Sequence, residues 1–181
     1  MNDLPVDSVL FLSIKQFILD LVIYNSETKY TQDRIVSGYQ NYAPVSGDNN
    51  FILMNLLYTD QPIIQSENYS RVNEELKQFE QVYKQKVDYT MQIDFVGQDA
   101  YATSNKFRNC INTRVGCDWL LRKYGLVVED CRLVNNQTQD IDQRAYVTKF
   151  PVQLKLQGCE IVIMPLNKFK EVGIGLFPIN Y

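Results

Sequence analysis

The sequence predicts an α+β fold: a largely antiparallel sheet, with an N-terminal helix and a central helix pair packed on one of its faces. In residues 87–95, apolar and polar side chains alternate, which is typical of a strand buried on one face. The apolar set is Val87, Tyr89, Met91, Ile93 and Phe95. In residues 9–24, apolar side chains recur instead at helical spacing, at Leu10, Ile14, Phe17 and Leu21. The order of helix, strands, two helices and strands therefore favours α+β.

The first fifty residues are predicted to hold one helix, one short strand and a long loop. Asp7 or Ser8 can cap the helix over residues 9–24. This helix is apolar on more than one side, so it either contacts a neighbouring subunit as well as its own sheet or is simply buried within the monomer. A short strand at residues 34–36 precedes a loop rich in turn-forming residues, Gly38 to Asn50.

An apolar strand over residues 51–58 is predicted next, followed by a polar connection at residues 66–69. Residues 72–86 allow two interpretations, because their charged side chains suit a helix surface while their alternation suits a strand. We favour a long strand that begins near Leu76. Its polar first half would then form an arm or hairpin around residues 70–86.

Two helices are predicted in the middle of the chain. Gly97 permits a tight turn after the strand, and Asp99 is placed to cap a helix that runs to about Thr113. Gly116 is predicted to break the helical structure.

A second helix over residues 119–124 is predicted to begin at an Asp118 cap and to end at Gly125. A strand over residues 126–133 and a polar loop over residues 135–140 follow.

The last part of the chain is predicted to form a strand over residues 144–156, with Pro151 marking a bulge or an edge. A turn at Gln157-Gly158 would return the chain into a strand over residues 160–164. Residues 165–181 receive no assignment.

Composition excludes several classes of function. The 181 residues suit one domain, and they contain no histidine, so histidine-dependent nucleophiles and metal sites are excluded. The net charge of −3 argues against tight binding to nucleic acid or to an anionic membrane. The apolar stretch 9–24 is too short to span a bilayer. The four cysteines have no paired spacing, which predicts ordinary buried thiols and neither zinc nor a disulfide; they are Cys110, Cys117, Cys131 and Cys159.

Few residues group in a way that could carry chemistry. Asp94 and Asp99 flank a turn and could hold a cation, but a polar strand face and a helix cap explain them better. Asp142 and Arg144 precede a strand, where a solvated loop and a charged contact with a partner are both open. Neither glycine-rich segment has the sequence of a phosphate-binding loop. We predict no catalytic residue, cofactor or metal.

Three stretches, by their order and spacing, resemble the neck or tail-terminator proteins of long-tailed phages and their prophages. Residues 34–44, which include Gly38-Tyr39-Gln40-Asn41-Tyr42-Ala43-Pro44, are similar to that family's Gly–Tyr/Asn–Gln–Asn…Pro loop. Residues 87–100 are similar to its Gln–Val/Ile–Asp–Phe–Tyr–Gly–Pro strand–turn–helix, and Arg108 stands where the family tends to carry an arginine in the helix that follows. Asp142-Gln143-Arg144-Ala145 resembles its polar segment before a strand.

The resemblance covers roughly residues 7–156, with Val96 in place of an aromatic residue and Gln98 in place of proline. It implies a structural virion protein whose ring, usually a hexamer, caps the tail tube and joins it to the head-side connector. The implied partners are further copies of the chain, the tail tube protein and a connector or adaptor, while DNA passes through the lumen without specific binding. The implied location is the tail or neck of a virion that is assembled in the host cytoplasm.

Aromatic and amide side chains suit contacts between subunits. The interface candidates are Tyr39, Gln40, Asn41, Tyr42, Tyr83, Arg108, Asp142 and Arg144. Two other functions stay open: a head–tail adaptor or tail-completion protein at a neighbouring position, and, less favoured, an enzyme that uses carboxylates.

Overall fold

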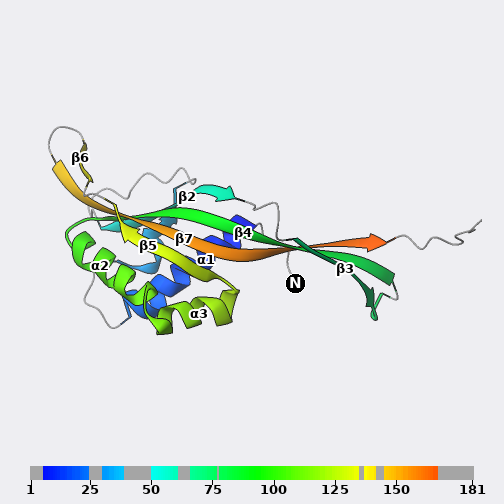
Figure 1. The fold of residues 1–181 in the computed structure, drawn as a ribbon. Coiled ribbons are helices and arrows are strands. Elements are labelled where there is room, and N and C mark those ends of the chain that lie inside the picture. The colour runs from blue at the N-terminus through cyan, green and yellow to red at the C-terminus, as the bar shows by residue number, and fades with distance from the viewer. Residues whose placement is uncertain are drawn as a thin grey trace, which may run out of the picture. The chain divides into compact units, whose positions relative to one another are not determined.

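The computed structural model describes residues 6–24, 30–38, 50–60, 66–76, 78–134, 137–141 and 145–166. In chain order, its elements are α1 (Val6–Phe17), a π-helix η1 (Ile18–Val22), a 3-10 helix η2 (Gln32–Arg34), β1 (Ile35–Ser37), β2 (Phe51–Asp60), β3 (Ser66–Asn73), β4 (Gln78–Val96), α2 (Ala100–Ile111), α3 (Arg114–Tyr124), β5 (Val127–Leu133), β6 (Gln137–Ile141) and β7 (Ala145–Leu166). The predicted α+β class is confirmed (Figure 1).

The chain divides into two compact units. Unit 1 comprises residues 1–62 and 86–159, and unit 2 comprises residues 63–85 and 160–181. Strands β4 and β7 are each long enough to contribute to both units.

The sheet runs in the order β1-β2-β4-β7-β5, with β3 also paired to β4 and β6 also paired to β7. The β1–β2 pair is parallel, whereas β2–β4, β3–β4, β5–β7 and β6–β7 are antiparallel. Strands β4 and β7 also run in opposite directions: Gly97 N donates to Thr148 O at 3.0 Å, while Gly158 lies against the Tyr89 ring. The sheet is therefore largely antiparallel, as the sequence predicts.

The core of unit 1 lies between the sheet and helices α1, α2 and α3, which cover one face of it (Figure 1). All five apolar residues of the alternating stretch of β4 belong to this core, as do Leu10, Ile14 and Phe17 of α1. The 2.0 and 3.6 residue periods in the sequence thus mark the buried faces of a strand and a helix. Lys15 Nζ also donates to Ile35 O at 3.2 Å, which ties α1 to β1.

The starts of two helices differ from the prediction, and a third helix starts as predicted but lacks the expected capping hydrogen bond. Helix α1 already includes Asp7 and Ser8, so neither residue is its N-cap. Asp99 is the N-cap of α2, but its side chain makes no capping hydrogen bond. Helix α3 begins at Arg114 instead of residue 119, because Thr113 Oγ1 accepts from Gly116 N at 3.1 Å and caps the helix.

Gly116 does not break the helix; it lies in the first turn of α3 and is buried. A Cβ added there would lie 2.2 Å from the carbonyl oxygen of Cys110. The glycine therefore lets the start of α3 approach the end of α2 closely. Gly125 ends α3 in the left-handed conformation, as predicted.

We predict that Gly116→Ala lowers the free energy of unfolding by about 1–3 kcal/mol, because the added methyl group must displace backbone atoms. Alanine would otherwise favour the helix by up to about 1 kcal/mol, so the sign of the change tests the packing argument. Urea unfolding followed by circular dichroism measures it. Val115→Ala, at a 69% exposed position in the same turn, is the control and should change stability by less than about 0.5 kcal/mol. A Gly116→Ala protein as stable as the wild type would contradict the argument.

Two segments predicted as loops are strands. Ser66–Tyr69, interpreted as a polar connection, begins β3, which pairs with β4 from Ser66↔Gln85 to Asn73↔Gln78. Within the predicted polar loop 135–140, residues from Gln137 belong to β6, which pairs with the start of β7. These strands form through backbone pairing with a neighbour, which leaves no hydrophobic period in their sequence.

The turn predicted at Gln157-Gly158 is also wrong, since β7 continues without interruption from Ala145 to Leu166. A Cβ at Gly158 would lie 2.9 Å from Cε2 of Tyr89, so the glycine makes room for a neighbouring ring. Pro151 lies in β7 between the stretch that pairs with β6 and the stretch that pairs with β5, and its carbonyl accepts from Val134 N at 2.9 Å. Pro151 has no backbone N–H, and its position between the β6–β7 ladder and the β5–β7 ladder means that neither ladder lacks a hydrogen bond because of it.

Candidate interface surfaces

Two of the eight interface candidates fall within the described residues. Tyr83 lies in β4 within unit 2, and Arg108 lies in α2 within unit 1; both side chains are partly exposed. The other six lie outside the described residues; they are Tyr39, Gln40, Asn41, Tyr42, Asp142 and Arg144.

The turn between β4 and α2 belongs to the second family-like stretch. Its backbone forms hydrogen bonds with described residues that follow the first and the third stretch along the chain. Asn50 follows the first stretch, and its Oδ1 accepts from Gln98 N at 2.8 Å. Thr148 follows the third stretch, and its carbonyl accepts from Gly97 N at 3.0 Å. Gly97 has φ 115°, a conformation that side chains disfavour, which confirms the predicted glycine turn. This corner of unit 1 therefore brings together Asn50 and Thr148, which follow the first and the third stretch along the chain.

Tyr30 strengthens the same corner. Its hydroxyl donates to Val96 O at 2.9 Å, and the side chain is buried. Burial, and then the negative charge of Asp99, raises the pKa of Tyr30 well above its usual range. The hydroxyl is therefore a permanent donor that supports the turn, with no acid–base role at neutral pH.

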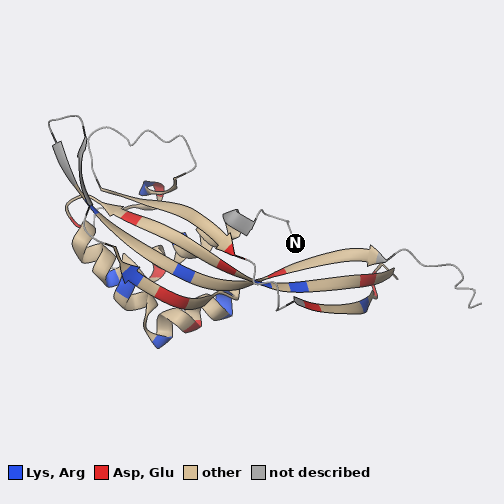
Figure 2. Cartoon of the chain, turned by 45° about the horizontal axis from the view of Figure 1, so that its top comes forward, with Lys and Arg blue, Asp and Glu red and all other residues tan. Residues whose placement is uncertain are grey.

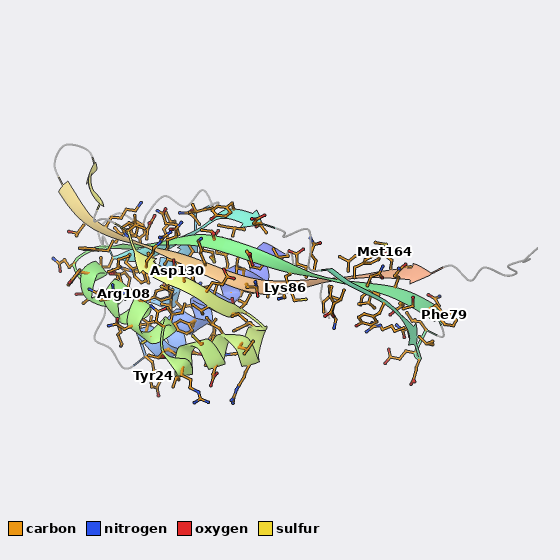
Figure 3. The ribbon with its side chains drawn as sticks, viewed as in Figure 1. Tyr24, Phe79, Lys86, Arg108, Asp130 and Met164 are labelled. Carbon is orange, nitrogen blue, oxygen red and sulfur yellow. The ribbon has the colours of Figure 1, made fainter. Side chains whose placement is uncertain are left out.

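Arg108 lies beside β5, on the side of unit 1 where α2 packs against that strand (Figure 3). Burial raises the pKa of the Cys131 thiol to about 12; Asp130 adds to this shift and Arg108 opposes it. The thiol is thus neutral at physiological pH and unreactive as a nucleophile. On the same strand, Arg132 Nε lies 3.5 Å from Asp130 Oδ2.

Unit 2 contains β3, the first half of β4 and the end of β7, which lie side by side in Figure 2. Glu80 accepts from Asn73 Nδ2 at 2.7 Å and from Arg71 Nε at 3.0 Å, and these hydrogen bonds hold the pKa of its carboxyl below the usual value. Lys84 Nζ lies 5.3 Å from the centre of the Tyr69 ring. Polar contacts of this kind stabilise the hairpin without a large core.

Unit 2 exposes many large apolar side chains. Val82 is buried, but eight others are 40% exposed or more; they are Tyr69, Val72, Leu76, Phe79, Ile161, Val162, Ile163 and Met164. Figure 3 shows two of them, Phe79 on β4 and Met164 on β7. Exposed apolar groups gathered in this way mark interaction sites. Sequence reasoning named here the polar segment 76–86, with Tyr83 as its candidate residue; the missed signal was four consecutive apolar residues without a charge, 161–164.

No chemical centre stands out in the part of the chain that the structure describes. Within it, no three His, Cys, Asp or Glu residues lie close enough together to hold a metal ion. The helices among the described residues are all too short or too polar to cross a membrane.

Residues 8–178 match a protein family described as phage neck terminator protein, which is nearly the whole chain. The chain belongs to this family. No curated protein matches the chain. Phage neck terminators are structural proteins and not a class of enzyme, so this is a structural protein of the virion neck and tail whose partners are other head and tail proteins.

Proposed function

We propose that copies of this chain form a homohexameric ring that caps the phage tail tube and joins it to the head-side connector. The observation that carries the proposal is the family match over residues 8–178. The exposed apolar surface of unit 2 supports it, because a ring requires each copy to offer contact surface to its neighbours. In this proposal DNA passes through the lumen without specific binding, and the net charge of −3 is consistent with that.

The candidate residues receive roles as contacts in this assembly. We assign Tyr83 of unit 2 and Arg108 of unit 1 to contacts with neighbouring copies or with the tube and connector proteins. The same role is proposed for the candidates outside the described residues, which are Tyr39, Gln40, Asn41, Tyr42, Asp142 and Arg144. In this proposal, assembly takes place in the host cytoplasm.

Purified protein, examined by native mass spectrometry and negative-stain microscopy, tests the ring. Immunogold labelling of virions tests its place, and the label is expected at the head-proximal end of the tail tube. Tails isolated without heads should carry the label at one end. A protein that is absent from particles would overturn the proposal, and a label that stays with heads while tails lack it would favour an adaptor on the head side.

Tyr83→Ala is expected to weaken assembly while the monomer stays folded, because aromatic anchors dominate interface energies. A loss of about 2 kcal/mol, typical of such an anchor, corresponds to roughly 30-fold weaker association. Sedimentation of labelled protein with isolated tail tubes measures it. The control is Tyr58→Ala, which removes the same side chain from a 52% exposed position on a strand of unit 1. Equal binding by the two variants would remove Tyr83 from the interface.

A further inference from the structure

The end of β7 in unit 2 is apolar on both faces. Ile161, Val162, Ile163 and Met164 are consecutive residues of this strand, and each is between 46% and 55% exposed. Because successive side chains of a strand point to opposite faces, both faces of this stretch carry side chains that are about half exposed in the part of the chain that the structure describes. Proteins normally protect such a strand with charges, or they cover it. This stretch contains no charge, so among the described residues it has neither form of protection.

The outer edge of this stretch is also open within the described residues. The described pairings of β7 with β6 and β5 involve residues 145–149 and 152–157. In the order of the described strands, the neighbour of β7 on its other side is β4. On the other side of unit 2, β3 pairs with β4 alone among the described strands, so the three strands leave two outer edges (Figure 2).

We propose that the outer edge of β7 at residues 161–164 pairs with the outer edge of β3 of a second copy of this chain, so that the sheet of unit 2 continues from one copy to the next. The inference rests on the proposed ring, because a contact between two different edges repeats from copy to copy, and it closes into a ring when the rotations between copies complete a full turn.

Strand β3 fits as the occupant because it offers apolar side chains on both of its faces. Tyr69 and Val72 are three residues apart on β3, so their exposed side chains lie on opposite faces of the sheet. In the β3–β4 ladder, Tyr69 pairs with Val82 and Val72 pairs with Phe79. In the extended sheet, each would lie beside apolar side chains of β7 on its own face. Cross-strand aromatic and β-branched pairs of this kind stabilise sheets.

The ring also fixes the direction of the pairing. Strands β3 and β7 both run antiparallel to β4, so within one copy they run in the same direction. A sixfold axis turns any strand by no more than one sixth of a turn between neighbours. Strand β3 of the next copy is therefore turned by no more than one sixth of a turn from β3 in the first copy, so its pairing with β7 is parallel and not antiparallel. A twofold dimer would instead place β7 against β7 in antiparallel orientation.

Cross-linking distinguishes the two arrangements. Ser70→Cys in β3 and Ile163→Cys in β7 are made separately in a Cys159→Ser background, because Cys159 is exposed. A short bismaleimide reagent should link the two variants when they are mixed, and should link neither variant to itself. The Cys159→Ser parent controls for the remaining cysteines. Self-linking of Ile163→Cys would overturn the parallel pairing in favour of the twofold dimer, and the absence of any link in assembled rings would overturn the strand pairing itself.

Blocking the edge gives an independent test. Ile163→Lys should leave the protein monomeric at concentrations at which the wild type forms rings, since a lysine on an edge strand opposes sheet extension. Val115→Lys, on an exposed position of α3 in unit 1, should form rings normally. Circular dichroism must show that both variants are folded. If Ile163→Lys unfolds, the cross-linking experiment still tests the strand pairing, because its cysteine substitutions add no charge. Normal rings from Ile163→Lys would overturn the inference and leave the proposed function intact. Cysteine variants that cross-link as predicted, together with a wild-type protein that is absent from virions, would overturn the proposed function and leave the inference intact.

Discussion

Replacing Phe107 with alanine is expected to lower the free energy of unfolding by about 3–5 kcal/mol. Phe107 is fully buried in α2, with its ring centre 5.8 Å from that of Phe17 and 5.6 Å from that of Phe95. It therefore joins α1, α2 and β4 at one point. The Phe17 ring continues this contact to Trp119 of α3 at 5.5 Å, so a cavity at position 107 loosens all three helices from the sheet.

Urea unfolding, followed both by circular dichroism and by the fluorescence of the only tryptophan, Trp119, measures this loss. Tyr101→Ala on the same helix is the control, because Tyr101 is 60% exposed and contacts one neighbouring ring, that of Phe150, at 5.2 Å. It should cost no more than about 1 kcal/mol. Equal effects of the two substitutions would show that the aromatic cluster does not hold the helices to the sheet.

Sequence patterns predicted the elements in which the burial of one face produces a regular spacing of apolar residues. Strand β4 alternates because one face meets the helices, and α1 repeats at helical spacing because it packs along the sheet. The glycine turn at Gly97 was predictable for a different reason, namely that few other residues adopt its φ of 115°.

Two errors came from glycines whose role depends on an atom of another helix or strand. Gly116 and Gly158 were both interpreted as breaks in regular structure, yet one lies in a helix and the other in a strand. In each case the glycine makes room for an atom of another segment, Cys110 O or the Tyr89 ring. Local sequence contains the glycine but not the neighbour, so it cannot separate a turn from a close contact.

The surface of unit 2 was hidden from sequence reasoning for a related reason. Four apolar residues in a strand, 161–164, look the same whether they are buried in a core or exposed to a partner. Only the fold shows that their edge and both faces are open among the described residues. Aromatic content drew attention to Tyr83, which lies in the same unit, but the consecutive apolar residues received no role.

Asp94 illustrates how a family-like motif can serve the fold. It was expected on the polar face of its strand, where a cation with Asp99 was one interpretation. The structure buries it: Lys149 Nζ of β7 lies 2.9 Å from Oδ2, and Gln92 Nε2 donates to Oδ1 at 2.8 Å. The cationic partner of this carboxylate is thus a lysine, and the pair ties β4 to β7 in unit 1.

Lys149→Met is therefore expected to lower the free energy of unfolding by about 3–5 kcal/mol, because it leaves the Asp94 carboxylate buried without its partner. The double variant Asp94→Asn/Lys149→Met removes both charges and should recover most of the loss, since the amide can still accept from Gln92. Chemical denaturation of the two variants and of Asp94→Asn alone completes a double-mutant cycle. If the double variant is as unstable as Lys149→Met, the cost comes from lost packing of the lysine stem and not from an unpaired charge. If Lys149→Met unfolds like the wild type, the pair between β4 and β7 contributes nothing to the sheet.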